Sequence, residues 1–394
     1  MRDVLVVGGG PAGTAAAILL RQRGHDVMLI DEAHFPRDKV CGEGISPEAW
    51  RLLGEVGATA AVRALRPKAL LGMTLVSPDG TAFTGAYGGS REGLAVRRLL
   101  FDAALLGVAR EAGVEVQEGV RACAVVTEAR QVVGVRALQS GHERDLRARL
   151  VIAADGRRSL VARRLGLLRE DRGFRRFSVR GHFTGVQGLC DHGEMHVGGG
   201  GYCGIAPLGG AREANVAFVL PEAEMRSAAG SLPDFYARTL HRWPRVAERL
   251  EGAHLLAPPR AVGPLALVAS RVSAPGAMLV GDAAGFYDPF TGEGVTLALR
   301  SAELAAAVAD RALRTGQLDD LRAYDRVRHE VTRDKFRLNR LIQHIVAWPD
   351  VANAVARRLS RRPRLADRLV GIAGDFVPAR SAFDLGFLYE FLTA

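Results

Sequence analysis

The stretch DVLVVGGGPAGTAAAILLRQRGHDVMLID, residues 3–31, decides the fold of this chain. Residues 3–7 are a short apolar run, typical of a strand that is buried on both faces. Glycines follow this run, and an Ala- and Leu-rich segment that reaches residue 23 predicts a helix. Residues 26–30 predict a second strand. The order of strand, glycine turn, helix and strand predicts an α/β fold that begins with a β-α-β unit.

The glycine turn has the spacing G-x-G-x-x-G, matched by Gly8, Gly10 and Gly13. In a Rossmann-type unit the first glycine permits the tight turn, the second lets a pyrophosphate approach the backbone, and the third lets the helix pack against the strand. Pro11 stands where the helix begins, because its missing N–H is not needed there. The first helical turn, which includes Ala12, offers free N–H groups to phosphates. The turn therefore predicts a dinucleotide site, and the alternative is a glycine-rich turn with a structural role alone.

An acidic residue follows the second predicted strand. Asp31 is placed to accept hydrogen bonds from an adenosine ribose, and Glu32 is the neighbouring alternative. This fingerprint does not choose between NAD and FAD, so the choice depends on the rest of the chain.

The composition excludes several other classes of protein. The chain of 394 residues is long enough for more than one domain, and its net charge of +10 comes almost wholly from scattered arginines, which disfavours nucleic-acid binding. The four cysteines lie far apart without a C-x-x-C pair, so we expect reduced thiols, a cytoplasmic protein and no metal site. No stretch is long and apolar enough to cross a bilayer.

Three later stretches carry a resemblance to a known family. They are RRLLFD at 97–102, VIAADGRRS at 151–159 and AMLVGDAAGFYDPFTGEG at 277–294. In this order they resemble the motifs of FAD-dependent oxidoreductases with the p-hydroxybenzoate hydroxylase type of fold. The resemblance implies that the dinucleotide is FAD.

The resemblance also implies roles for individual residues. Arg98 would contact the flavin dinucleotide, and Asp282 would bind the ribityl chain or the FAD ribose region. A helix from about residue 295 to residue 313 would begin near the flavin, where its N-terminus stabilises negative charge on the reduced ring. The cofactor-binding residues implied by these three motifs are Arg98, Asp155, Gly156, Gly281, Asp282, Pro289, Gly292 and Gly294.

A further stretch narrows the resemblance. FPRDKVCGEGISPEA at 35–49 is similar to a segment of the geranylgeranyl reductase-like branch, which has R-x-K-x-C-G at this point. In that branch the segment passes beside the isoalloxazine, so the resemblance makes Arg37, Lys39, Cys41 and Gly42 flavin-proximal. Cys41 is also a candidate catalytic residue, with a substrate contact or simple packing as its alternatives.

The substrate side departs from these relatives. GYCGIAPLGG at 201–210 stands where geranylgeranyl reductases and halogenases often carry Tyr/Trp-x-Trp before a proline. Tyr202 and Pro207 are retained, whereas Gly204 stands where an indole would. We expect Tyr202, Cys203, Gly204 and Pro207 to line an enlarged substrate pocket. The missing indole counts against halogenation and weakens the pure reductase interpretation.

Two other side chains are candidates for catalysis. His196 lies in the strand-like run GEMHV, and Tyr287 lies beside the glycine-rich motif of residues 277–294. Either side chain could face the flavin, although a lone histidine on a strand more often has a structural role.

The pattern of elements predicts three parts. A discontinuous Rossmann-type FAD-binding domain comprises 1–69, 91–170 and 262–345, and a mixed β-sheet substrate domain comprises 70–90 and 171–261. A C-terminal helical segment, 346–394, carries a basic run at 357–368. This run is interpreted as a solvated helix face, with contact to an anionic membrane surface as the alternative.

The favoured function is an NAD(P)H-dependent monooxygenase. It would oxygenate a hydrophobic aromatic, polyketide or isoprenoid compound of specialised metabolism through a C4a-hydroperoxide of the flavin, with NAD(P)H docking transiently. The alternative is a geranylgeranyl reductase-like enzyme that saturates C=C bonds, followed by a halogenase and by a flavin-binding protein without turnover. The expected partner is a hydrophobic small molecule, without nucleic acid and without stable membrane insertion. Oligomeric state is left open.

Overall fold

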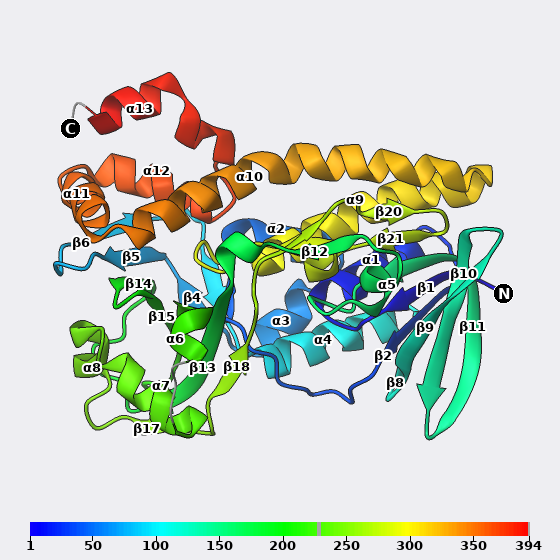
Figure 1. The fold of residues 1–394 in the computed structure, drawn as a ribbon, viewed down its shortest axis with the longest axis horizontal. Coiled ribbons are helices and arrows are strands. Elements are labelled where there is room, and N and C mark those ends of the chain that lie inside the picture. Colours follow the sequence, from blue (N-terminus) through cyan, green and yellow to red (C-terminus); the bar gives the residue numbers. More distant parts are fainter. Residues whose placement is uncertain (227–229, 393–394) are drawn as a thin grey trace.

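The computed structural model describes residues 1–226 and 230–392 and contains two large sheets, which lie side by side in Figure 1. In the first sheet β1 pairs in parallel with β11 on one side and with β2 on the other. The strands of its main path are, in spatial order, β20 (Ser273–Ala274), β21 (Ala277–Leu279), β11 (His142–Ala153), β1 (Arg2–Val7), β2 (Val27–Asp31) and β8 (Glu115–Glu118). The antiparallel strands β9 (Arg121–Glu128) and β10 (Gln131–Gln139) extend from β11. The predicted β-α-β start is therefore confirmed.

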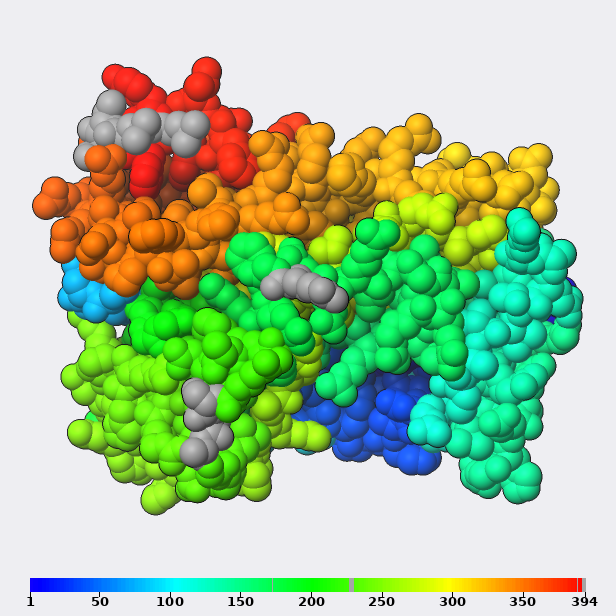
Figure 2. Space-filling view, viewed as in Figure 1, coloured from blue at the N-terminus to red at the C-terminus, as the bar shows by residue number. Residues whose placement is uncertain are grey.

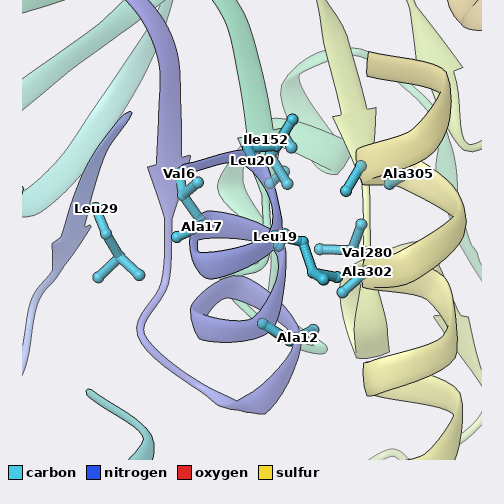
Figure 3. Close-up of a cluster of buried hydrophobic side chains, with 14 of the residues drawn as sticks. Val6, Ala12, Ala17, Leu19, Leu20, Leu29, Ile152, Val280, Ala302 and Ala305 are labelled. Carbon is cyan, nitrogen blue, oxygen red and sulfur yellow. The ribbon is translucent and has the colours of Figure 1, made fainter. Parts of the chain in front are cut away.

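Helix α1 (Pro11–Gln22) fills the space between this sheet and α9 (Gly294–Thr315). Figure 3 shows Leu19 and Leu20 of α1 among Ile152 of β11 and Val280, which follows β21, with Ala302 of α9 close by. Small side chains on α9 let the two helices approach closely, and their burial contributes about 25 cal/mol per Å² of apolar surface. This packing fixes both helix N-termini at the same edge of the sheet.

The second sheet is mixed, as the sequence predicts. Strand β14 pairs in parallel with β5 and antiparallel with β15. The main path runs β17 (His254–Leu255), β13 (Arg176–Thr184), β16 (Ala214–Pro221), β15 (Gly201–Pro207), β14 (His192–Gly198), β5 (Gly72–Val76) and β6 (Ala82–Ala86), and β18 (Arg260–Val262) pairs with β13. The predicted domain boundaries stay a prediction, because strand pairing does not show where one domain ends.

Different helices cover the two faces of the second sheet. On one face α7 (Leu232–Leu240) and α8 (Pro244–Arg249) enclose an aromatic core in which Phe218 stacks on Tyr236 and on Trp243. On the other face Tyr202 and Val219 pack with Val346 of the C-terminal helices.

The part of the chain from residue 323 onward forms a layer along one side of the molecule, coloured yellow to red in Figure 2. Its helices are α10 (Ala323–Ala347), α11 (Pro349–Ser360), α12 (Pro363–Ala373) and α13 (Leu385–Leu392). Helix α10 runs from the first sheet to the second (Figure 1), so one rigid element spans both halves of the chain. The other helices and strands are α2 (Pro47–Glu55), α3 (Thr59–Ala64), α4 (Arg98–Glu111), α5 (Leu160–Arg164), α6 (Glu222–Arg226), β3 (Gly44–Ile45), β4 (Lys68–Leu70), β7 (Gly93–Ala95), β12 (Leu168–Glu170), β19 (Leu267–Ala269) and β22 (Gly285–Phe286).

Candidate active site

The turn between β1 and α1 has no room for side chains except at one glycine. A Cβ on Gly8 would lie 2.4 Å from the carbonyl oxygen of Ala154, and one on Gly13 would lie 1.9 Å from that of Gly8. A Cβ on Gly10 would meet only Nη2 of Arg37, at 3.7 Å. Gly10 therefore borders open space beside the N-terminus of α1, where a phosphate can approach the backbone. Pro11 and Ala12 line the same space.

Asp31 lies at the end of β2 with its carboxylate fixed by two backbone donors. Its oxygens accept the N–H of Gly9 at 2.7 Å and the N–H of Ala33 at 2.8 Å. Asp31 and Glu32 both line the cavity that begins at the glycine turn. This is the position from which an acid reaches the ribose hydroxyls of a bound dinucleotide.

Asp155 supplies an acceptor that no described residue satisfies. Its Oδ2 accepts the N–H of Leu160 at 2.7 Å, but its Oδ1 is buried without a hydrogen-bond partner in the described chain. Burial raises the pKa of this carboxyl. Since an unsatisfied buried acceptor costs about 1–3 kcal/mol, a ligand that donates a hydrogen bond here would recover that free energy. Together with the open space at Gly10, Asp155 fits FAD, and Gly156 lines the cavity beside it.

The predicted glycine-rich stretch meets α1 from the opposite side. Gly281 has a φ of 59°, and a Cβ there would lie 2.7 Å from the Cβ of Ala12. The Asp282 carboxylate forms an ion pair with Nζ of Lys39 at 3.4 Å, and both residues line the cavity. Helix α9 begins at Gly294, close to the predicted start. Pro289 and Gly292 complete the lining of this side.

Buried charge pairs hold the loop at 35–46. Asp102 accepts two hydrogen bonds from Arg98, at 2.7 and 2.8 Å, and one from Arg37 at 2.9 Å. Arg98 is buried and borders the cavity, but its guanidinium is already engaged by Asp102. It positions the loop as well as facing the cofactor space.

Glu43 is a site residue that the sequence analysis missed. Its Oε1 accepts the backbone N–H of Arg98 at 3.0 Å, and its Oε2 bonds to Nε2 of His182 at 2.7 Å and Nδ2 of Asn215 at 2.9 Å. Nδ1 of His182 lies 3.0 Å from Nη1 of Arg180, which can only donate, so Nε2 carries the imidazole hydrogen and donates it to Glu43. The φ of Glu43 is 62°, a left-handed value that costs about 1–2 kcal/mol for a residue with a side chain. The only sequence signal was an acid enclosed by two glycines in CGEG.

Glu43 and Asn215 fix Cys41 in turn. The Cys41 Sγ accepts the N–H of Glu43 at 3.3 Å, and the carbonyl oxygen of Cys41 accepts Nδ2 of Asn215 at 2.8 Å. Asp38, earlier in the loop, pairs with Arg180 at 2.6 Å. The predicted flavin-proximal residues Arg37, Lys39, Cys41 and Gly42 all line the cavity. The loop is thus attached to α4 and to the second sheet.

A single cavity of about 1120 Å³ contains these groups and extends past them. Beyond the loop it continues as an apolar arm between the second sheet and the C-terminal helices. Its walls include Met195, Tyr202 and Val219 from the strands and Ile345, Val355 and Phe391 from the helices. The arm can enclose a long hydrophobic molecule with one end beside the cofactor space.

Tyr202 and Gly204 lie in the wall of this arm, as the sequence analysis expects. The Tyr202 hydroxyl donates to Oδ1 of Asp288 at 2.5 Å, and Gln343 donates to the same oxygen at 2.8 Å. Burial raises the pKa of Asp288 to about 6. At Gly204 a Cβ would first meet the methyl group of Met195, at 3.5 Å, which is ordinary van der Waals contact.

Three residues that the sequence analysis expects near the flavin or the substrate lie elsewhere in the structure. Cys203 is buried on the opposite face of the sheet, in the core under α7 and α8, because successive residues of a strand face opposite sides. His196 pairs with Cys203 across the strands and hydrogen-bonds to Glu194 at 2.9 Å, so its ring also lies away from the arm. Pro207 closes β15 and is not among the cavity-lining residues of the described chain.

Tyr287 also lies outside the lining of the cavity in the described chain. Its ring packs against Phe174 with a centroid separation of 5.2 Å, beneath the guanidinium of Arg340. Burial raises the pKa of its hydroxyl to about 12. This geometry gives no support to the expected catalytic role.

The open space at Gly10 and the unsatisfied acceptor of Asp155 form a dinucleotide site that fits FAD, and an apolar arm continues from it, which is the arrangement expected of an FAD-dependent oxidoreductase. A family model described as an FAD binding domain matches residues 1–338. The chain belongs to this family.

Two curated relatives resemble most of the chain. It is 33% identical over 326 residues to the menaquinone reductase of Mycobacterium tuberculosis, which covers 78% of this chain and 76% of the relative. It is 32% identical over 336 residues to the digeranylgeranylglycerophospholipid reductase of Methanosarcina mazei, which covers 80% of this chain and 77% of the relative. The resemblance to the geranylgeranyl reductase-like branch is thereby confirmed.

Among solved structures, the flavin-dependent halogenase CmlS superposes with a TM-score of 0.78 at 27% identity. The match covers 84% of this chain but only 62% of CmlS. A flavoprotein/dehydrogenase from Cytophaga hutchinsonii matches 95% of this chain with a TM-score of 0.84 at 22% identity, which shows a shared fold. No helix within the described residues has the length and apolarity needed to cross a bilayer.

Proposed function

We propose that this protein is a reductase that uses FAD to saturate C=C bonds in the prenyl chain of an isoprenoid lipid. Both relatives described above are named as reductases of isoprenoid lipids, a menaquinone and a digeranylgeranylglycerophospholipid. The proposal therefore prefers the geranylgeranyl reductase-like activity, which the sequence analysis gave as its alternative, to monooxygenation.

The observation that carries the proposal is the apolar arm, which continues directly from the cofactor space. A prenyl chain has no polar group along its length, and its burial is favourable by about 0.8 kcal/mol for each carbon. An aromatic or polyketide substrate would instead need placed polar groups to orient it. The arm walls are mainly aliphatic and aromatic, which suits a prenyl chain.

Different residues of the chain would bind the cofactor and enclose the substrate. When bound, FAD supplies the hydride that adds to the double bond. Asp31, Asp155 and the glycine turn would hold its nucleotide, and the arm would exclude water from the reacting carbons.

Saturation of a double bond also consumes a proton. Tyr202 lines the arm, and its hydroxyl, whose pKa burial raises above the usual 10, holds a proton at neutral pH. Asp288, its hydrogen-bond partner, can return a proton to it. We propose that Tyr202 donates this proton and that NAD(P)H supplies the electrons that reduce FAD.

The test is anaerobic turnover. The FAD-loaded protein is reduced with NADPH or NADH and mixed without oxygen with a polyprenyl alcohol in detergent, while flavin absorbance is followed. We expect reoxidation of the flavin and a product that has gained pairs of hydrogen atoms by mass spectrometry. The fully saturated alcohol is the matched control and should leave the flavin reduced.

Monooxygenation is the second candidate, favoured by Gly204, which lines the cavity where the reductases often carry an indole. It predicts no anaerobic reoxidation and, once oxygen is admitted, a product that has gained an oxygen atom. That result would overturn the reductase proposal.

A further inference from the structure

The helices at the open end of the arm expose apolar side chains as well as lining the cavity. Leu341 of α10 and Val351 of α11 line the arm, yet they are 45% and 46% exposed. A residue that is both lining and exposed marks the mouth of a cavity. Trp348 lies between them in the chain, at the turn from α10 to α11, and is 67% exposed.

An exposed tryptophan at an apolar mouth is unusual for a surface that faces only water. The indole ring combines an apolar body with one N–H donor, which suits the boundary between lipid headgroups and acyl chains. Trp348 makes no cation–π or ring contact among those seen in the described chain. We define Leu341, Trp348 and Val351 as the mouth cluster.

The same helical layer carries unpaired positive charge. Arg361, Arg362 and Arg364 are exposed at the turn from α11 to α12, and none has a carboxylate partner in the part of the chain that the structure describes. By contrast, Arg357 and Arg368 on the flanking helices pair with Asp79 and Asp384. The three unpaired arginines lie at the C-terminal end of α11, whereas Trp348 and Val351 of the mouth cluster lie at its N-terminal end.

We propose that this end of the molecule docks on an anionic lipid bilayer, with the mouth cluster at the headgroup–acyl boundary and the three arginines on lipid phosphates. The proposal rests on the proposed function, because it gives the prenyl chain a path from the bilayer into the arm without crossing water. A mouth that leads into an apolar cavity suits a lipid surface better than a protein partner, which would have to close it. The chain's net charge of +10 also attracts it to an anionic surface.

The test is flotation of the full-length, FAD-loaded protein with vesicles of phosphatidylcholine alone or mixed with phosphatidylglycerol. We expect co-flotation with the mixed vesicles, weakened by salt, together with a blue shift of tryptophan emission. Each arginine near an anionic surface strengthens binding by about a factor of five, so replacing all three with Gln should weaken it roughly a hundredfold. Binding to both vesicle types that is insensitive to these changes would overturn the proposal, as would binding to neither.

Trp348→Asp tests the apolar half of the surface. Trp348 is the N-cap residue of α11, a position that Asp favours, so the variant should fold. We expect loss of the emission shift and weaker flotation. Leu256→Asp is the matched control, since Leu256 is 44% exposed but follows β17 on the substrate sheet, away from the C-terminal helices, and it should float normally.

The outcomes separate docking from reduction. Turnover of a detergent-dissolved polyprenyl alcohol without vesicle binding would refute docking and leave the reductase proposal standing. Vesicle binding without turnover of any polyprenyl compound would refute the reductase proposal instead.

Discussion

Replacement of Glu43 tests the network that fixes the Cys41 loop. Glu43→Ala removes the acceptor of three buried donors, on Arg98, His182 and Asn215. Each donor left unsatisfied costs about 1–3 kcal/mol, so we expect a loss of about 4–5 kcal/mol once some water enters the space. Glu43→Gly removes the same acceptor but also relieves the left-handed φ of 62°, which returns about 1 kcal/mol.

The predicted order of stability is therefore native chain, then Glu43→Gly, then Glu43→Ala. Urea unfolding followed by circular dichroism measures this order, and flavin fluorescence measures FAD affinity in the same proteins. Asp145→Ala is the control, because its ion pair with Arg136 lies on the exposed β10–β11 hairpin, and it should leave the unfolding midpoint unchanged. If Glu43→Gly equals or exceeds the native chain in stability, the three hydrogen bonds contribute nothing net and the assigned role is refuted.

Three shorter predictions concern the cofactor space and the arm. Gly10→Glu should fold, because a Cβ at this position meets only Arg37, at 3.7 Å. The new carboxylate would occupy the place of the FAD phosphate, so the purified protein should be colourless. Yellow protein with native FAD content would contradict the assignment of Gly10 to the phosphate site. Burial raises the pKa of Asp288 to about 6, above its usual value near 4, so native stability should fall by about 3 kcal/mol as the pH rises from about 4 to about 6. Asp288→Asn keeps an acceptor for Tyr202 and should abolish that slope in urea unfolding; an unchanged slope would assign it to other groups. Gly204→Ala places a methyl group in ordinary contact distance of its neighbours, so the Tm should stay unchanged. The methyl group should raise the KM for the longest prenyl chain that the protein turns over. An unchanged KM would show that the substrate does not pass this point.

The cofactor half of the site could be predicted because its signals are local. Gly8, Gly10 and Gly13 lie within six residues, and the strand, helix and acid that give them meaning end at Asp31. Each requirement is imposed by neighbouring backbone, as the 1.9 Å approach of a Cβ on Gly13 to the Gly8 carbonyl shows. A local requirement of this kind can be recognised in a single sequence.

The substrate half depends on contacts between distant residues. Glu43 meets His182 and Asn215, 139 and 172 residues further along, and no spacing rule connects them. The apolar arm exists only because α10 to α13 pack over one face of the second sheet, which amphipathic helices alone do not specify. The error at Cys203 is of another kind: strand alternation already placed it opposite Tyr202 and Gly204, so those three neighbours could not all face one pocket.

The family match ends at residue 338, within α10, whereas the helical wall of the arm lies mostly beyond that point. One wall of the arm is therefore encoded apart from the residues that line the nucleotide space, whereas the opposite wall comes from strands inside the matched region. Changes in the last fifty or so codons can lengthen, shorten or reshape the arm without disturbing the residues that hold the nucleotide. Under the proposed function, an exchange of the C-terminal helices would change which molecule fits the arm and leave the residues beside the nucleotide intact.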